Sequence, residues 1–73
     1  MFLERLKECR DLKQVTQKVA AAELGISERA YQHYELGTRE PNITMLVAIA
    51  VYFDVSLDYL MGRSTIRDSH KKQ

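Results

Sequence analysis

Apolar residues recur every three or four positions along most of the chain, which is the spacing of a helix that buries one face. No stretch alternates β-branched and polar residues, so the pattern gives no indication of a strand. Helix-breaking residues are few, namely Gly25, Gly37, Pro41 and Gly62. The pattern therefore predicts an all-α fold with five short helices, at residues 2–12, 17–24, 27–36, 43–54 and 57–61.

The predicted helices have clear beginnings and inner faces. A side chain that can accept a hydrogen bond from the first helical turn precedes four of them, at Thr16, Ser27, Asn42 and Ser56. We expect Cys9 to be a small core residue rather than a reactive thiol, because no base stands near it in the pattern. The spacing predicts a core built from Phe2, Leu3, Leu6, Cys9, Val15, Ile26, Tyr31, Tyr34, Ile43, Leu46, Ile49, Ala50, Phe53 and Val55.

The second and third predicted helices are separated by a very short turn at residues 25–27. Gly25 can adopt the positive φ that ends a helix, and the preceding alanines at 20–22 lack the bulk that would keep another helix away. Two helices joined in this way form a helix-turn-helix. The second helix of such a pair protrudes, and a protruding helix fits the major groove of B-DNA, which is about 12 Å wide.

The third predicted helix has two different faces. Residues 30, 31 and 34 give it an apolar and aromatic back, whereas the front carries Glu28, Arg29, Gln32 and His33. Arg29 can bind guanine through two hydrogen bonds, Gln32 can pair with adenine, and Glu28 can accept from cytosine. His33 can donate to a base or a phosphate. The alternative is a solvated polar face with no ligand, which is common on surface helices.

Several short motifs stand in register along the chain: Thr16-Gln17, Leu24-Gly25-Ile26-Ser27, Tyr34-Glu35, Arg39-Glu40-Pro41 and Val55-Ser56-Leu57-Asp58-Tyr59-Leu60. Together they resemble the Cro/CI-type helix-turn-helix family, the lambda-repressor-like or XRE-family domains, from about Arg5 to Gly62. The resemblance implies a compact five-helix bundle with the helix-turn-helix at helices 2 and 3. It also implies sequence-specific binding to double-stranded DNA, usually as a homodimer on a palindromic operator.

The resemblance assigns roles to individual positions. The groove-facing positions, which would read bases, are Ser27, Glu28, Arg29, Gln32 and His33. The positions that would contact phosphates are Gln17, Thr38, Arg39 and Asn42, of which Gln17 would also brace the recognition helix. A partly buried ion pair between Arg10 and Glu35 would tie the first helix to the third.

This chain departs from the family pattern at a few of these positions. Ala20 replaces a larger aliphatic residue and Tyr31 replaces an aliphatic one, so we expect the Tyr31 ring to fill the space that Ala20 leaves. Leu36 stands where a polar, phosphate-contacting residue is common, and Gln14 replaces a usual glycine.

Composition adds limits to this interpretation. The chain has 73 residues, one cysteine and a formal net charge of +1, so it predicts one domain with no internal disulfide and weak electrostatic steering. The sequence offers no metal cluster, catalytic set, signal peptide or membrane span, which predicts a cytoplasmic bacterial or phage protein that is not an enzyme and needs no cofactor. We expect residues 1–62 to form the DNA-binding domain and residues 63–73 a polar, basic, flexible tail.

The fourth predicted helix has more hydrophobic residues than its inner face needs. A helix that is apolar nearly all round is normally covered. We expect a homodimer or partner interface at Val51, Tyr52, Leu57 and Met61. The leading hypothesis is a DNA-binding transcriptional regulator, most plausibly a repressor. The alternative is a DNA-binding antitoxin or a protein-interaction module that uses the apolar fourth helix, and a regulatory partner protein fits either one.

Overall fold

The beginning of each helix after the first is fixed by a side-chain cap. In the computed structural model, which describes residues 1–67, the five α-helices are α1 (Phe2–Lys13), α2 (Gln17–Leu24), α3 (Glu28–Leu36), α4 (Ile43–Phe53) and α5 (Leu57–Leu60). These bounds confirm the five predicted helices to within one residue at each end, and no strand occurs in the described part of the chain.

All four predicted caps form. The hydroxyl of Thr16 accepts a hydrogen bond from the Val19 backbone N–H at 3.1 Å. Ser27 accepts from Ala30 at 3.1 Å, Asn42 from Met45 at 2.8 Å and Ser56 from Tyr59 at 3.0 Å. Each cap satisfies a backbone donor that has no partner inside the helix, so the turn residues determine where the helices begin.

The helix ends are less regular than the beginnings. Gly37 ends α3 with a φ of 82°, a conformation that strains other residues, and a Cβ atom on it would lie 2.8 Å from a methyl carbon of Leu3, which would have to shift. By contrast, Gln14 ends α1 with a φ of 61° and Asp54 ends α4 with a φ of 57°. The left-handed conformation at Gln14 explains why a glycine suits this position.

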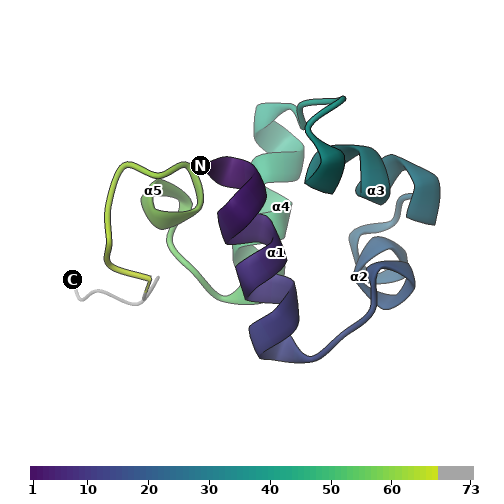
Figure 1. Ribbon diagram of the computed structural model, residues 1–73, viewed down its shortest axis with the longest axis horizontal. Helices are drawn as coiled ribbons and strands as arrows, with labels where there is room; N and C mark the ends of the chain where they lie inside the picture. Colours follow the sequence, from purple (N-terminus) through teal and green to yellow (C-terminus); the bar gives the residue numbers. More distant parts are fainter. Residues whose placement is uncertain (68–73) are drawn as a thin grey trace.

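The helices enclose one core (Figure 1). α1 crosses in front of α4, the α2–α3 pair lies at one end of the molecule, and α5 lies at the other. The described core confirms most of the predicted stripe residues and consists of Leu6, Cys9, Ala20, Ala21, Tyr31, Tyr34, Ile49, Ala50, Phe53, Val55, Tyr59 and Leu60. Phe2, Val15 and Ile26 are partly buried and pack against it.

One predicted core residue is wrong. Ile43 has 65% of its surface exposed, and Val47 and Val51 on the same helix are exposed as well. These residues are spaced by four, so they form a stripe on α4 that is rotated away from the buried Ile49 and Phe53. The apolar spacing alone did not distinguish the two stripes, because almost every position of α4 is apolar.

Tyr31 occupies the centre of the core. Its side chain and Ala20 are both completely buried in the same cluster, which agrees with a large ring standing opposite a small residue. Its hydroxyl is buried and faces the Glu35 carboxylate. Burial, followed by the neighbouring Glu35 carboxylate, raises the pKa of Tyr31 far above its ordinary value.

The first residues of the predicted tail pack against the bundle. The Ser56 backbone N–H and hydroxyl donate to the carbonyls of Arg67 and Ile66 at 2.7 and 2.9 Å, and Arg5 donates to the Ser64 carbonyl at 2.7 Å. Residues 63–67 are therefore held beside α1 and α5, which the polar composition did not reveal. The remainder of the predicted tail, residues 68–73, lies outside the described residues.

Truncating Tyr31 should remove the largest fully buried side chain of the core. We expect Tyr31→Ala to lower the free energy of unfolding by about 3–5 kcal/mol, which a domain of this size can barely tolerate. Tyr31→Phe should stay within about 1 kcal/mol of the wild type, because it keeps the ring that fills the core. Urea denaturation followed by circular dichroism measures both variants, and equal effects of the two would contradict a space-filling role.

Candidate nucleic-acid interface

The α2–α3 pair has the geometry of a helix-turn-helix. α2 ends at Leu24, and three residues later α3 begins. The backbone N–H groups of Gly25 and Ile26 donate to the carbonyls of Ala22 and Ala21 at 3.1 and 3.0 Å, which closes the end of α2 and reverses the chain. Ala20 and Ala21 are buried, and their small side chains let α3 pack closely across α2. Figure 1 shows α3 at the outer edge of the molecule.

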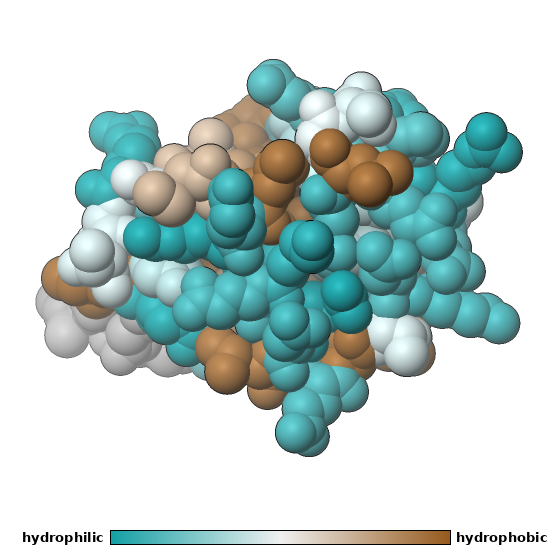
Figure 2. Space-filling model, viewed as in Figure 1, coloured by the Kyte–Doolittle hydropathy of each residue, from teal (hydrophilic) through white to brown (hydrophobic). Residues whose placement is uncertain are grey.

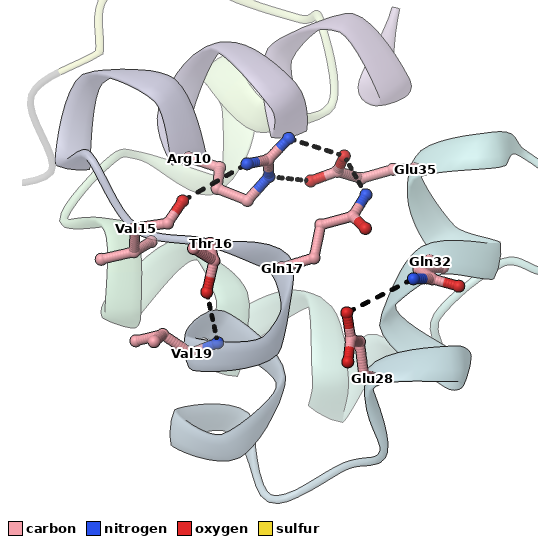
Figure 3. A network of polar contacts seen from close by, with 8 residues as sticks. All are labelled: Arg10, Val15, Thr16, Gln17, Val19, Glu28, Gln32 and Glu35. Atoms are coloured by element: carbon pink, nitrogen blue, oxygen red, sulfur yellow. Dashed lines mark hydrogen bonds and ion pairs between the residues drawn. The ribbon is translucent and has the colours of Figure 1, made fainter.

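A polar network holds α3 to the two helices behind it (Figure 3). Arg10 on α1 donates from Nε to Glu35 Oε2 at 2.7 Å and from Nη2 to Oε1 at 3.3 Å. Gln17 at the start of α2 donates from Nε2 to the same Oε1 at 3.0 Å. The structure thus contains the expected Arg10–Glu35 pair, and it adds Gln17 as a further ligand of the carboxylate.

This network keeps Glu35 ionised inside the protein. The Glu35 side chain is 3% exposed, and burial alone would raise its pKa. The hydrogen bonds and charge of Arg10, together with the hydrogen bond from Gln17, outweigh burial and lower the pKa of Glu35 below its ordinary value. The same hydrogen bond to Glu35 raises the pKa of Arg10, so both partners stay charged.

The outward face of α3 gathers four of the five predicted base readers. Glu28, Arg29, Gln32 and His33 line a shallow open hollow of about 470 Å³, and Leu36 continues it toward the end of the helix. Ser27 has a different position, since its hydroxyl caps α3. The hollow therefore presents an arginine, an amide, an imidazole and a carboxylate on one side of one helix, with an exposed leucine beside them.

The readers differ in how firmly they are held. Gln32 donates to Glu28 at 3.5 Å, which is a long and weak contact one turn apart. The His33 ring nitrogen Nδ1 lies 2.7 Å from the Thr38 hydroxyl. Arg29 is exposed and makes no hydrogen bond or ion pair within residues 1–67, so its five N–H donors are available to a ligand.

The predicted phosphate-contacting residues lie at the start of α2 and in the segment between α3 and α4. Gln17 begins α2 and contacts Glu35 near the end of α3. Thr38 and Arg39 follow α3, and both are exposed. Asn42 caps α4 with its side-chain oxygen, which leaves the amide nitrogen as a donor. The structure places Thr38 differently from the prediction in one respect, because its hydroxyl already contacts His33.

The predicted interface residues do not form one exposed patch. Val51 is 74% exposed, whereas Tyr52 and Leu57 are partly buried against the core. Met61 lines a small apolar groove of about 140 Å³ with Phe2, Pro41 and Leu46. On the face drawn in Figure 2, hydrophobic residues gather in the upper part, over the region where α1 begins and α3 ends, and smaller groups lie near the lower edge. The exposed residues that accompany Val51 on α4 are Ile43 and Val47, which the sequence reasoning did not select as an interface.

Comparison with known proteins decides the family. A family model described as helix-turn-helix matches residues 6–60, which include all of α2, α3 and α4. The chain belongs to this helix-turn-helix family. Membership agrees with the five-helix architecture.

Relatives of this helix-turn-helix chain carry regulator names. It is 52% identical over 99% of its length to the uncharacterized HTH-type transcriptional regulator YqaE of Bacillus subtilis, covering 66% of that protein. It is 42% identical to the cryptic phage CTXphi transcriptional repressor RstR of Vibrio cholerae over 82% of its length, covering 54% of that protein. It is 35% identical to the HTH-type transcriptional activator BcrR of Enterococcus faecalis over 84% of its length, covering 30% of that protein.

The chain thus spans between about one third and two thirds of these relatives. No solved structure matches it. Within residues 1–67, none of the helices has the length and apolar character needed to cross a membrane, and no group of His, Cys, Asp and Glu side chains is arranged to hold a metal ion.

The lowered pKa of Glu35 makes stability depend on pH in a defined direction. A carboxylate whose pKa is lower in the folded protein contributes stability above its unfolded pKa of about 4.3, and the contribution is lost as the pH falls through the folded value. We expect Glu35→Gln to be about 3 kcal/mol less stable than the wild type at pH 7. This difference should shrink as the pH is lowered from about 5 toward 3. Chemical denaturation across this range tests it, and a pH-independent difference would contradict the ionised network.

Proposed function

We propose that this chain is the DNA-binding domain of a transcriptional regulator and binds double-stranded DNA in a sequence-specific manner by placing α3 in the major groove. The observation that carries the proposal is the outward face of α3, where Arg29, Gln32 and His33 stand together on a helix that is fixed from behind. The names of the relatives support it, since they include regulators, a repressor and an activator.

Each front residue has a base that suits it. The free guanidinium of Arg29 matches guanine O6 and N7, and the amide of Gln32 matches adenine N6 and N7. Glu28 repels phosphates, so its role is to reject unsuitable bases and to accept from cytosine N4. Ser27 lies at the start of α3, where its backbone and hydroxyl face the groove edge. These four positions, with His33, form the proposed reading surface.

Phosphate contacts would set the position of α3 on the duplex without reading its sequence. Arg39 supplies a free positive charge, and Thr38 supplies a hydroxyl. Gln17 and Asn42 stand at the N-terminal ends of α2 and α4, where unpaired backbone N–H groups also favour anions. Since the whole chain has a formal net charge of only +1, these local contacts would have to supply most of the attraction.

The proposed regulator is a repressor that acts in the bacterial cytoplasm as a homodimer. A symmetric dimer would place two copies of α3 in successive major grooves about 34 Å apart and would select a palindromic operator. Val51, with Tyr52, Leu57 and Met61 nearby in the sequence, remains the proposed interface. The exposure of Val51 supports it, and the partial burial of Tyr52 and Leu57 limits their share.

A second candidate function is favoured by the exposed stripe of Ile43, Val47 and Val51. This stripe offers a partner protein an apolar surface on a helix that contains no charged residue. A DNA-binding antitoxin, or an interaction module with a regulatory partner, would use α4 in this way. Co-purification of a stoichiometric small protein from the native host would favour this candidate over a homodimer.

Selection from random duplex DNA, followed by binding assays, tests the reading surface. We expect Arg29→Ala to cost about 1–3 kcal/mol on the selected site and to relax selectivity at one base pair. Arg39→Ala should instead weaken binding to all sequences similarly and reduce the salt slope by about one. If Arg29→Ala left selectivity unchanged at every position, Arg29 would not be a base reader.

Sedimentation over a range of concentrations tests the dimer. We expect the average mass of the wild type to rise with concentration and Val51→Lys to remain monomeric, because a buried unpaired ammonium opposes association. Leu12→Lys is a matched control, since Leu12 is similarly exposed on α1 but lies outside the proposed interface. A monomer mass for the wild type at all concentrations, with and without the selected DNA, would argue against a homodimer.

A further inference from the structure

The end of α3 is tied to the loop that follows it by four contacts on one residue, His33. The backbone N–H groups of Gly37 and Thr38 donate to the His33 carbonyl at 3.0 and 3.1 Å. The Thr38 hydroxyl then reaches back to the His33 ring, with 2.7 Å between Oγ1 and Nδ1. A side chain on the reading face is thus connected to a residue outside the helix.

The position of Thr38 is determined by the fold and not by the contact itself. Gly37 has a φ of 82° and lies against Leu3 of α1, so the turn after α3 is fixed to the body of the domain. Thr38 is β-branched, and its single side-chain torsion has few alternatives. The hydroxyl is therefore held in place before it meets the ring, which keeps the entropy lost in the contact small.

The direction of this bond depends on the tautomer of the ring. A threonine hydroxyl has one hydrogen to donate and two lone pairs that accept. The Thr38 hydroxyl lies 3.5 Å from the His33 carbonyl, a long contact to which it can donate, and it could donate to a DNA phosphate instead. When its hydrogen is used in either of these ways, the ring contact is formed by Nδ1–H donating to Oγ1, and a neutral ring carries its free lone pair on Nε2. When the hydrogen is given to the ring, Nδ1 accepts and Nε2 carries the proton.

We propose that Thr38 is a positioning residue for base reading: it holds the His33 ring in the Nδ1–H form and presents Nε2 to the major groove as an acceptor. The inference rests on the proposed DNA-binding function. It gives Thr38 a part in specificity beyond a phosphate contact, and it names the chemistry that His33 reads. An acceptor in the major groove pairs with the amino group of adenine N6 or cytosine N4.

Without the hydroxyl, the imidazole ring would lose this constraint. The torsion that turns the ring has two broad and nearly equivalent minima, which exchange Nδ1 with Cδ2 and Nε2 with Cε1. The bond to one ring nitrogen also determines which nitrogen carries the proton. Thr38→Val keeps the shape of the side chain and removes only the hydroxyl, whereas Thr38→Ser keeps the hydroxyl and serves as the matched control.

The first test uses the free protein and does not depend on DNA. Nitrogen-15 NMR of the full chain at about pH 8 reports which ring nitrogen is protonated. His33→Ala identifies the signals of this ring. We expect the Nδ1–H form in the wild type and in Thr38→Ser, and a loss of this bias in Thr38→Val. An Nε2–H form in the wild type, or no difference in Thr38→Val, would overturn the proposal.

The second test uses duplexes selected from random DNA. We expect Thr38→Val and His33→Ala to reduce discrimination at the same base pair, on the order of fivefold, with an adenine or cytosine amino group as the preferred partner. Thr38→Ser should retain the preference, and the double variant should discriminate no less than His33→Ala alone.

Two other outcomes separate the inference from the proposed function. If Thr38→Val weakened binding to all sequences equally and lowered the salt slope, Thr38 would be a phosphate contact only and the positioning role would be overturned. If the wild type showed no sequence preference at all, the proposed function itself would fail, and the inference with it, whatever the form of the ring.

Discussion

The Glu35 carboxylate is the point at which three helices are joined. It lies on the back of α3, is almost completely buried, and receives hydrogen bonds from Arg10 on α1 and from Gln17 on α2. A buried carboxylate without these partners would take up a proton, so the ionised group and its donors require one another. Because the two donors come from different helices, a shift of α3 relative to either would break a charged hydrogen bond. The orientation of α3 depends on this constraint more than on its own nine residues.

Apolar contacts on the back of α3 hold the helix in place together with the hydrogen bonds of Glu35. Tyr31 and Tyr34 bury the back of the helix, and the alanines of α2 leave room for them. The core contacts and the buried ion pair of α3 are therefore on one side. On the other side the exposed side chains make the Gln32–Glu28 and His33–Thr38 contacts, which bury no core residue. This separation leaves residues such as Arg29 free to be selected for a ligand, since changing them removes no core contact. A reading surface on a helix that packed on both sides would not have this freedom.

Much of this arrangement follows from local rules that the sequence displays. The caps at Thr16, Ser27, Asn42 and Ser56 and the glycines after α2 and α3 each act within four residues, so they could be read directly. The burial of Tyr31 could be predicted from its place on the back of the helix. The Arg10–Glu35 pair joins residues far apart in the chain, and only the family resemblance indicated it.

The features that escaped prediction depend on longer distances or on unusual conformations. Gln14 and Asp54 adopt a left-handed conformation that their residue types do not predict. The fold imposes it at these positions because the chain must turn sharply between two helices. The packing of residues 63–67 depends on carbonyls meeting Arg5 and Ser56, which polar composition does not reveal. The contact of Thr38 with His33 spans a helix end, where neither the helical period nor a cap rule applies.

The fourth helix, α4, carries a proposed phosphate contact at its beginning and an exposed apolar stripe that extends to its end. Its first turn begins at Asn42, whose side-chain cap leaves an amide nitrogen near the proposed phosphate contacts. The exposed stripe starts beside it at Ile43 and ends at Val51, two turns further along. A protein that covered the beginning of this stripe would compete with DNA, whereas one that covered only the end near Val51 would not. The position of a partner along α4 would therefore decide whether association opposes DNA binding or accompanies it.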